Sequence, residues 1–225
     1  MAGWRRSERV GRVHVLTDVE LQTRFSHVEL AVRALEGGAH VVQFRQKTGS
    51  TRVLIAVARQ MGQVCRAAGA TFIVNDRVDV ALASQADGVH LGQSDAPIPF
   101  ARRLLGPRAI IGGSASTVEQ ARRCIEEGAD YVGFGPVYPT GSKADAAPVR
   151  GLELLREVAA ALPAPVIAIG GIDAVRARAV LRAGAQGFAV ISAVCCEEDP
   201  AEATRRLLLA LEEPGARHPD EEEET

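Results

Sequence analysis

Acidic and basic side chains that suit phosphate and metal binding follow several short apolar runs of the chain. Asp76 and Asp95 supply two carboxylates, and Arg45, Lys47 and Lys143 supply three cations. Hard oxygen ligands suit Mg²⁺, which proteins hold with one or two carboxylates plus substrate phosphates. Arg and Lys can share the phosphate charge with the metal. The set predicts a Mg²⁺ site and a diphosphate substrate, while a structural network of mutually neutralising charges is the alternative.

A second group of candidate residues lies in the stretch 131–143, YVGFGPVYPTGSK. Its aromatic and β-branched start predicts a buried strand, and proline and glycine then end any regular element. Thr140, Ser142 and Lys143 bring two hydroxyls and a cation into the loop that follows. These groups are suited to holding phosphate oxygens, although a surface turn with a solvated lysine would have the same composition.

Eight short apolar runs position these residues. Each run is apolar along its length instead of alternating with polar residues, which is typical of parallel strands covered on both faces. The runs occupy residues 12–18, 41–46, 71–76, 88–92, 109–115, 131–137, 165–171 and 187–193.

Amphipathic segments lie between the runs, with apolar residues returning every three or four positions, which predicts helices. Glycine in EGGAH, RAAGA, EEGAD and RAGAQ predicts helix ends before four of the strands. Asp173 is expected to cap the helix that follows it. The clearest helical segments are 27–38, 51–68, 118–128 and 173–184.

Strands and helices that alternate eight times predict a single (β/α)₈ TIM barrel, an α/β fold that typically has about 250 residues. No Gly/Ser/Pro-rich linker interrupts the pattern, which favours one domain over two doubly wound halves. We expect the catalytic barrel domain to span 11–213, after a frayed N-terminal arm at 1–10. Residues 214–225, with four consecutive glutamates, are expected to form a disordered acidic tail.

A barrel of this kind carries its chemistry at the carboxyl ends of the strands. Polar or small residues stand at those ends in most of the predicted strands. His90, between two apolar neighbours, is expected to be a packed histidine more than a catalyst. The strand-end residues are Gln43, Arg45, Lys47, Asn75, Asp76, His90, Gln93, Asp95, Ser114, Ser116, Thr140, Ser142, Lys143, Gly170, Gly171, Ile191 and Ser192.

A second anion site is expected after the last two strands, at IAIGGI (167–172) and AVISAV (189–194). Glycine permits close backbone approach, and N–H groups there could bind a phosphate. Barrel phosphate sites commonly use these two loops. Ordinary helix-to-strand packing at Gly170 and Gly171 is the less favoured alternative.

Composition excludes several classes of partner. The 225-residue chain is 47% hydrophobic, its net charge is -2, and its Lys and Arg residues are spread out, so no nucleic-acid footprint is visible. No apolar segment of signal-peptide length follows the arginines in MAGWRRSERV, and no apolar run has the length of a membrane span, so we expect a soluble cytoplasmic protein without a membrane partner. The sequence leaves formation of a homo-oligomer open.

The cysteines and histidines do not indicate a metal centre. Cys65, Cys124, Cys195 and Cys196 have neither metal-ligand spacing nor a disulfide framework, so we expect four small buried thiols. The five histidines are scattered, and none forms an HxxxH pair. A zinc site is not expected.

Taken together, these motifs resemble the thiamine phosphate synthase family, also called thiamine-phosphate diphosphorylase. The resemblance covers about residues 13–194. It rests on VQFRQK, IVNDRVDVAL, ADGVHLGQSD, IIGGSAST, DYVGFGPVYPTGSK, AIGGI and AVISA in combination. It implies that 4-amino-2-methyl-5-hydroxymethylpyrimidine diphosphate and 4-methyl-5-hydroxyethylthiazole phosphate react to give thiamine phosphate and diphosphate.

The resemblance also implies roles for individual residues. Asp76 and Asp95 match the family's Mg²⁺ ligands. Arg45, Lys47, Ser114 and Lys143 are implied to be catalytic through contacts with the reacting diphosphate. The same resemblance implies that Gln43 and Asn75 join them around the pyrimidine diphosphate, and that the thiazole-phosphate contacts are Thr140, Ser142, Gly171, Ile191 and Ser192.

Three positions depart from the family pattern. Gln46 replaces a common Glu, Ser142 replaces a common Thr, and Ser116 stands where a His is often found. The related thiazole tautomerases use that His, so its absence disfavours a tautomerase. A non-catalytic phosphate-binding regulator would be expected to lose metal or diphosphate residues. A phosphosugar isomerase would need an acid/base pair, for which Asp18 and Asp173 are the candidates.

Overall fold

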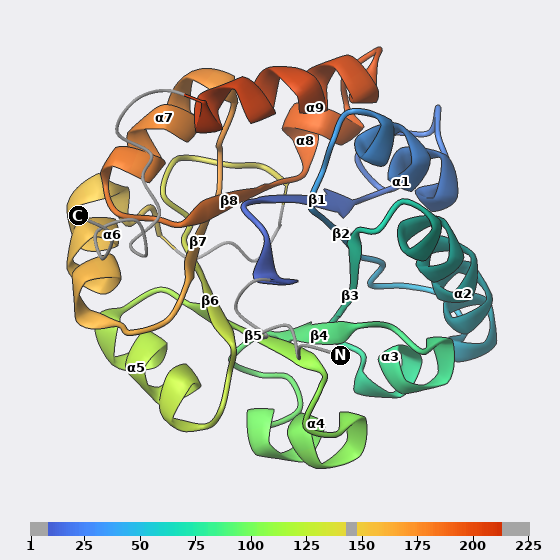
Figure 1. Cartoon of the computed structure of the whole chain (residues 1–225), viewed down its shortest axis with the longest axis horizontal. Coiled ribbons are helices and arrows are strands. Elements are labelled where there is room, and N and C mark those ends of the chain that lie inside the picture. Colours follow the sequence, from blue (N-terminus) through green and yellow to red (C-terminus); the bar gives the residue numbers. More distant parts are fainter. Residues whose placement is uncertain (1–8, 143–147, 213–225) are drawn as a thin grey trace, which may run out of the picture.

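Eight parallel strands close into one barrel in the computed structural model, which describes residues 9–142 and 148–212 (Figure 1). Each strand pairs with its neighbours in sequence order, and β8 pairs with β1 to complete the ring. The predicted (β/α)₈ barrel is confirmed. The strands are β1 Val13–Thr17, β2 Val41–Phe44, β3 Thr71–Asn75, β4 Gly88–Leu91, β5 Ile110–Ala115, β6 Tyr131–Phe134, β7 Val166–Ile169 and β8 Gly187–Val190.

Helices surround the strands as an outer ring (Figure 1). The predicted strand runs continue beyond the strands observed, because the chain turns into site-forming loops there. β6 ends at Phe134, before Pro136, which has no N–H to donate to a strand ladder. The helices are α1 His27–Glu36, α2 Thr51–Ala67, α3 Val78–Ser84, α4 Ile98–Leu105, α5 Val118–Glu126, α6 Gly151–Ala161, α7 Ala174–Arg182, α8 Ser192–Cys195, α9 Pro200–Leu208 and the 3₁₀ turn η2 Leu209–Leu211.

Local sequence signals set the helix ends as predicted. Gly38, Gly69, Gly128 and Gly184 follow helices with φ of 94°, 72°, 98° and 94°, in the left-handed region that favours glycine. Asp173 caps α7, because its Oδ1 accepts hydrogen bonds from two backbone N–H groups of the first turn at 3.0 and 2.8 Å.

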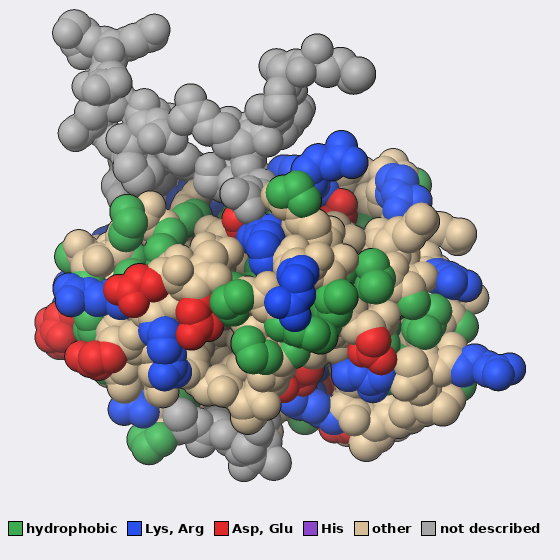
Figure 2. Space-filling view, turned by 90° about the horizontal axis from the view of Figure 1, so that it is seen from below, with side chains coloured by type: hydrophobic (Ala, Val, Ile, Leu, Met, Phe, Trp, Pro, Cys, Tyr) green, Lys and Arg blue, Asp and Glu red, His purple; other side chains and the backbone are tan. Residues whose placement is uncertain are grey.

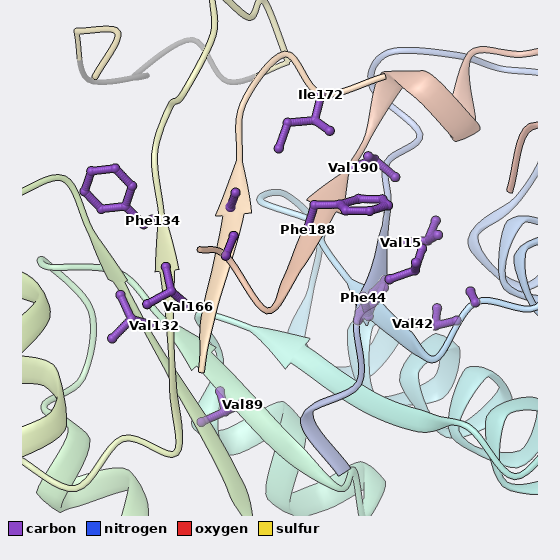
Figure 3. Close-up of a cluster of buried hydrophobic side chains, with 14 of the residues drawn as sticks. Val15, Val42, Phe44, Val89, Val132, Phe134, Val166, Ile172, Phe188 and Val190 are labelled. Carbon is purple, nitrogen blue, oxygen red and sulfur yellow. The ribbon is translucent and has the colours of Figure 1, made fainter. Parts of the chain in front are cut away.

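The hydrophobic core has two layers, because successive strand residues point to opposite faces of the barrel wall. The outer layer packs between strands and helices and includes Val15, Phe44 and Phe188 (Figure 3). The inner layer fills the barrel and includes Leu16 and Ile73. Burying each such side chain contributes about 1.5–3 kcal/mol, so both layers fix where the strand ends lie.

The structure departs from the expected frayed N-terminal arm at residues 9 and 10, which contact the barrel. Val10 is buried against the inner layer, and Arg9 pairs with Asp87 while its carbonyl accepts a hydrogen bond from Thr71 Oγ1 at 2.9 Å. The prediction of a frayed arm is therefore wrong for Arg9 and Val10. Residues 1–8 and the predicted tail at 214–225 lie outside the described residues.

Surface charge follows the balanced composition. Lys and Arg side chains alternate with Asp and Glu side chains over the face in Figure 2, and no single sign dominates it. On this face the described side chains show no basic stripe of the kind typical of nucleic-acid binding. Within 9–142 and 148–212, no helix combines the length and apolar character needed to cross a membrane.

Candidate functional site

A cavity of about 370 Å³ opens at the carboxyl ends of the strands. Loops after β2 to β8 contribute to its wall, so residues far apart in sequence meet there. Most of the predicted site residues line it. These are Lys47, Asn75, Asp76, Asp95, Ser114, Thr140, Ser142, Gly171, Ile191 and Ser192, together with Gln93, Ser116 and Gly170.

The two predicted metal ligands, Asp76 and Asp95, both line the cavity and lie close to each other. Asp76 has a left-handed backbone, with φ of 64°, and its N–H donates to His90 O at 2.8 Å. Asp95 Oδ2 accepts the Gly92 N–H at 2.6 Å. Burial raises the pKa of Asp95, and the neighbouring Asp76 raises it further, while the Gly92 N–H and Lys47 oppose the rise. The carboxylates are thus close enough to repel each other.

A hard divalent cation fits this pair. Lys47 Nζ lies 2.6 Å from Asp76 Oδ2 and offsets part of the negative charge. Among the described residues, no group of three His, Cys, Asp or Glu side chains could hold a metal by itself. Proteins nevertheless commonly bind Mg²⁺ through only one or two carboxylates, while substrate phosphates and waters complete its octahedral coordination. The donor set therefore suits Mg²⁺ only together with a phosphorylated ligand.

Arg45 takes a different position from the one expected. It is 6% exposed and pairs with Asp18, whose side chain is 2% exposed. Asp18 Oδ1 also accepts backbone N–H groups of Glu20 and Leu21 at 2.8 and 3.2 Å. Arg45 does not line the cavity, so the three predicted cations do not converge there in the described residues. Lys143, the third cation, lies outside them.

Asp18 was suggested by the sequence only as a candidate acid or base. Its pairing with Arg45 joins the residue that follows β1 to the residue that follows β2, so the contact depends on how two side chains turn between neighbouring strands. Gln46, which departs from the family pattern, lies beside His27 in this region. Burial lowers the pKa of His27 to about 4, so its ring is neutral at physiological pH.

A smaller cavity of about 20 Å³ lies among inward-facing strand residues. Gln43 and His14 contribute to its lining, and Gln43 Oε1 and His14 Nε2 are buried without hydrogen-bond partners in the described protein. Buried polar atoms normally have partners. The predicted pyrimidine contact Gln43 thus presents an unused acceptor close to the larger cavity, since Ser114 lines both cavities.

The side chain of Ser114 forms a hydrogen bond with His90. His90 Nε2 lies 2.9 Å from Ser114 Oγ, and His90 Nδ1 lies 3.0 Å from the Tyr131 hydroxyl. His90 is therefore packed and hydrogen bonded, as predicted. The sequence did not indicate that Tyr131 takes part in these hydrogen bonds, because its position among apolar strand residues predicted packing alone.

The hydroxyl residues of the predicted phosphate loop meet those after β8. Ser142 Oγ lies 3.3 Å from Ser192 Oγ, and Thr140 Oγ1 accepts the Ser142 N–H at 3.2 Å. Gly171 has φ of 61°, and a Cβ there would overlap the Pro139 carbonyl. Only glycine combines this backbone with so close an approach. The structure thus brings the predicted thiazole-phosphate residues together.

Ser116 forms hydrogen bonds with residues that the sequence did not suggest as its partners. Its N–H and Oγ bond to Gln120 Oε1 at 2.8 and 3.1 Å, and Arg150 Nη2 donates to its Oγ at 3.2 Å. Arg150 comes from the segment before α6, so the contact is not visible in the local sequence.

The cysteines take no part in the cavity. Three are buried as predicted, but Cys196 is exposed, because it follows the last turn of α8; the prediction of four buried thiols is wrong there. Burial raises the pKa of Cys65 and of Cys195 to about 12. These two thiols stay protonated at neutral pH and are poor nucleophiles.

Comparison with known proteins identifies the family to which the chain belongs. A family model described as thiamine monophosphate synthase matches residues 13–194. The chain belongs to this family. Within the thiamine monophosphate synthase family, it is 57% identical over 195 residues to the thiamine-phosphate synthase of Methanocella arvoryzae, covering 87% of this chain and 92% of that protein. The Salinibacter ruber thiamine-phosphate synthase is 49% identical over 208 residues, with 92% of each chain covered.

A solved structure extends the likeness to three dimensions. Thiamine phosphate pyrophosphorylase from Pyrococcus furiosus superposes with a TM-score of 0.82 at 42% identity, covering 92% of this chain and 97% of that one. As a member of the thiamine monophosphate synthase family, the chain is an enzyme, a transferase that acts on small phosphorylated substrates.

The buried ion pair generates a prediction about stability. Asp18→Ala should lower the free energy of unfolding by about 3–5 kcal/mol, because it leaves Arg45 buried without its partner. Asp79→Ala is the matched control, since the Arg77–Asp79 pair is exposed, with side chains 37% and 54% accessible. That change should cost less than about 1 kcal/mol. Denaturant unfolding measures both, and equal losses would contradict a structural role for the buried pair.

Proposed function

We propose that the protein catalyses the Mg²⁺-dependent condensation of 4-amino-2-methyl-5-hydroxymethylpyrimidine diphosphate with 4-methyl-5-hydroxyethylthiazole phosphate, giving thiamine phosphate and diphosphate. One observation carries the proposal. A single cavity combines the Asp76, Asp95 and Lys47 cluster with the hydroxyls of Ser142 and Ser192. Two differently built anion sites in one cavity suit two phosphorylated substrates that must react with each other.

In this proposal, Asp76 and Asp95 hold Mg²⁺ against the diphosphate. When bound, the ion would supply positive charge to the diphosphate oxygens and so favour departure of the leaving group. Lys47, which already bonds Asp76, would share the diphosphate charge. The repulsion that raises the pKa of Asp95 would be relieved by the cation.

The remaining diphosphate contacts are assigned by their place in the fold. Asn75 and Ser114 line the same cavity, at the ends of β3 and β5. Gln43 would use its unpartnered Oε1 toward the pyrimidine. For Arg45, the proposal requires its guanidinium to turn from Asp18. Lys143 completes the catalytic set from outside the described residues. The catalytic set is therefore Arg45, Lys47, Ser114 and Lys143.

The thiazole phosphate is assigned to the opposite side of the cavity. Thr140, Ser142 and Ser192 offer hydroxyls, which can donate to phosphate oxygens. Gly171 and Ile191 contribute backbone close to the same place, and glycine leaves room for that approach. Ser142 and Ser192 are neutral donors, unlike the charged groups proposed to hold the diphosphate.

The reaction follows from where charge develops. Loss of diphosphate from the pyrimidine methylene transfers an electron pair to the leaving oxygen, where Lys47 and the donors around it act most strongly. The electron-rich aminopyrimidine would carry the positive charge left on the methylene, and the thiazole nitrogen would then form the new bond to that carbon. No protein nucleophile is needed, which agrees with the absence of cysteine from the cavity among the described residues.

Product formation with and without metal tests this function. The purified protein, given both substrates and Mg²⁺, should form thiamine phosphate and diphosphate in equal amounts, and EDTA should stop both. Asp95→Asn should lower kcat by more than about 100-fold, because the proposed Mg²⁺ site loses one of its two carboxylates and the cation that favours departure of the diphosphate is held less well. Asp79→Asn, at the exposed start of α3, is the control and should retain activity. Diphosphate formation without thiamine phosphate, or full activity in EDTA, would overturn the proposal.

A charge placed at the other end of the cavity tests the thiazole-phosphate assignment. Ser192→Asp should raise the KM for the thiazole phosphate by about tenfold or more, because it sets a like charge beside that phosphate. The KM for the pyrimidine diphosphate should change far less. Cys196→Asp, which adds the same charge beyond the cavity lining, serves as the control. Steady-state kinetics with each substrate varied would measure this, and an unchanged KM for Ser192→Asp would move the phosphate elsewhere.

A further inference from the structure

A chain of three side chains runs from the interior of the barrel to the cavity. Tyr131 at the start of β6 bonds His90 of β4, and His90 bonds Ser114 near the end of β5. The Tyr131 hydroxyl and His90 Nδ1 are 3.0 Å apart, and His90 Nε2 and Ser114 Oγ are 2.9 Å apart. Only the last member faces the larger cavity.

The strands make room for this chain. A Cβ on Gly112 would overlap both the Tyr131 ring and the His90 ring, and a Cβ on Gly133 would lie 2.8 Å from His90 Cε1. Glycines of β5 and β6 are therefore what allows the two rings to occupy the barrel interior. Glycine inside a strand weakens it, so this space has a cost to the sheet.

The direction of the hydrogen bonds can be inferred from burial. Tyr131 is 1% exposed, and within the described residues its hydroxyl bonds only to His90. The neighbouring His14 ring lies 5.5 Å from the Tyr131 ring, but His14 Nε2 makes no hydrogen bond there. Burial raises the pKa of Tyr131, so the phenol keeps its proton. If Tyr131 only accepted from His90, that buried proton would have no acceptor.

We propose that Tyr131 and His90 form a relay that orients the Ser114 hydroxyl as a hydrogen-bond donor. Tyr131 donates to His90 Nδ1, so in this arrangement the proton of the imidazole ring is on Nε2. His90 Nε2–H donates to Ser114 Oγ, so the Ser114 proton points to an oxygen of the ligand in the cavity. That this oxygen belongs to the leaving diphosphate rests on the function proposed above.

The relay would act most strongly as the diphosphate leaves. Hydrogen bonds in a chain polarise one another, so a donor at Ser114 Oγ strengthens the bond that the Ser114 hydroxyl makes. The receiving oxygen gains negative charge in the transition state, which makes the bond more valuable there than in the bound substrate. Tyr131 and His90 are thus positioning residues, and they should affect kcat more than KM.

The tautomer of His90 can be measured without turnover. In ¹⁵N-labelled free protein at neutral pH, His90 Nε2 should carry the proton and Nδ1 should be unprotonated, with the signals assigned by their loss in His90→Gln. Tyr131→Phe should give a mixture of the two tautomers. A proton on His90 Nδ1 in the unsubstituted protein, alone or in a doubly protonated ring, would overturn the relay. Because this arm needs no substrate, failure of the proposed function would not affect it.

Kinetics test whether the relay acts through Ser114. Tyr131→Phe should lower kcat about tenfold, the value of one neutral hydrogen bond, with each KM within about twofold. In a Ser114→Ala background, the same change should lower kcat by less than about twofold. Tyr138→Phe is the matched control and should leave kcat unchanged, because the Tyr138 ring contacts Arg176 and phenylalanine retains that contact. Tyr131→Phe should unfold at a somewhat lower temperature than Tyr138→Phe, because the buried His90 Nδ1 loses its donor, but both variants should be folded at the assay temperature. A full tenfold loss in the Ser114→Ala background, or no loss at all, would contradict the relay.

Discussion

Closure of the parallel barrel is the constraint on which the rest of the structure depends. Because β8 hydrogen bonds to β1, all strands end at one rim, and residues from 47 to 192 line a single cavity there. The two hydrophobic layers hold this arrangement by packing both faces of the wall. A parallel ring thereby creates a site to which almost every loop can contribute one or two side chains.

The site divides that rim into unlike halves. Asp76, Asp95 and Lys47 form a charged half suited to a metal and a diphosphate. Ser142 and Ser192 form a half of neutral hydroxyl donors. The Arg45–Asp18 pair is buried and does not line the cavity, and it links the segments that follow β1 and β2.

Sequence patterns predicted the parts that are local or repeated. The glycine helix ends and the Asp173 cap involve contacts within a few residues, and strand-end placement followed from the eightfold repeat. The pairing of Arg45 with Asp18 was missed, because it depends on which way a long side chain turns between two strands. The burial of Val10 was missed for a related reason, since the inner layer that covers it comes from distant strands.

The central claim is that the charged half and the hydroxyl half of one cavity bind the two phosphorylated groups. The most direct measurement is a crystal structure of the protein with thiamine phosphate, diphosphate and Mg²⁺. The account predicts the diphosphate and metal between Lys47, Asp76 and Asp95, and the phosphate of thiamine phosphate beside Ser142 and Ser192. Density for the diphosphate among the hydroxyls, or a metal away from both aspartates, would contradict it.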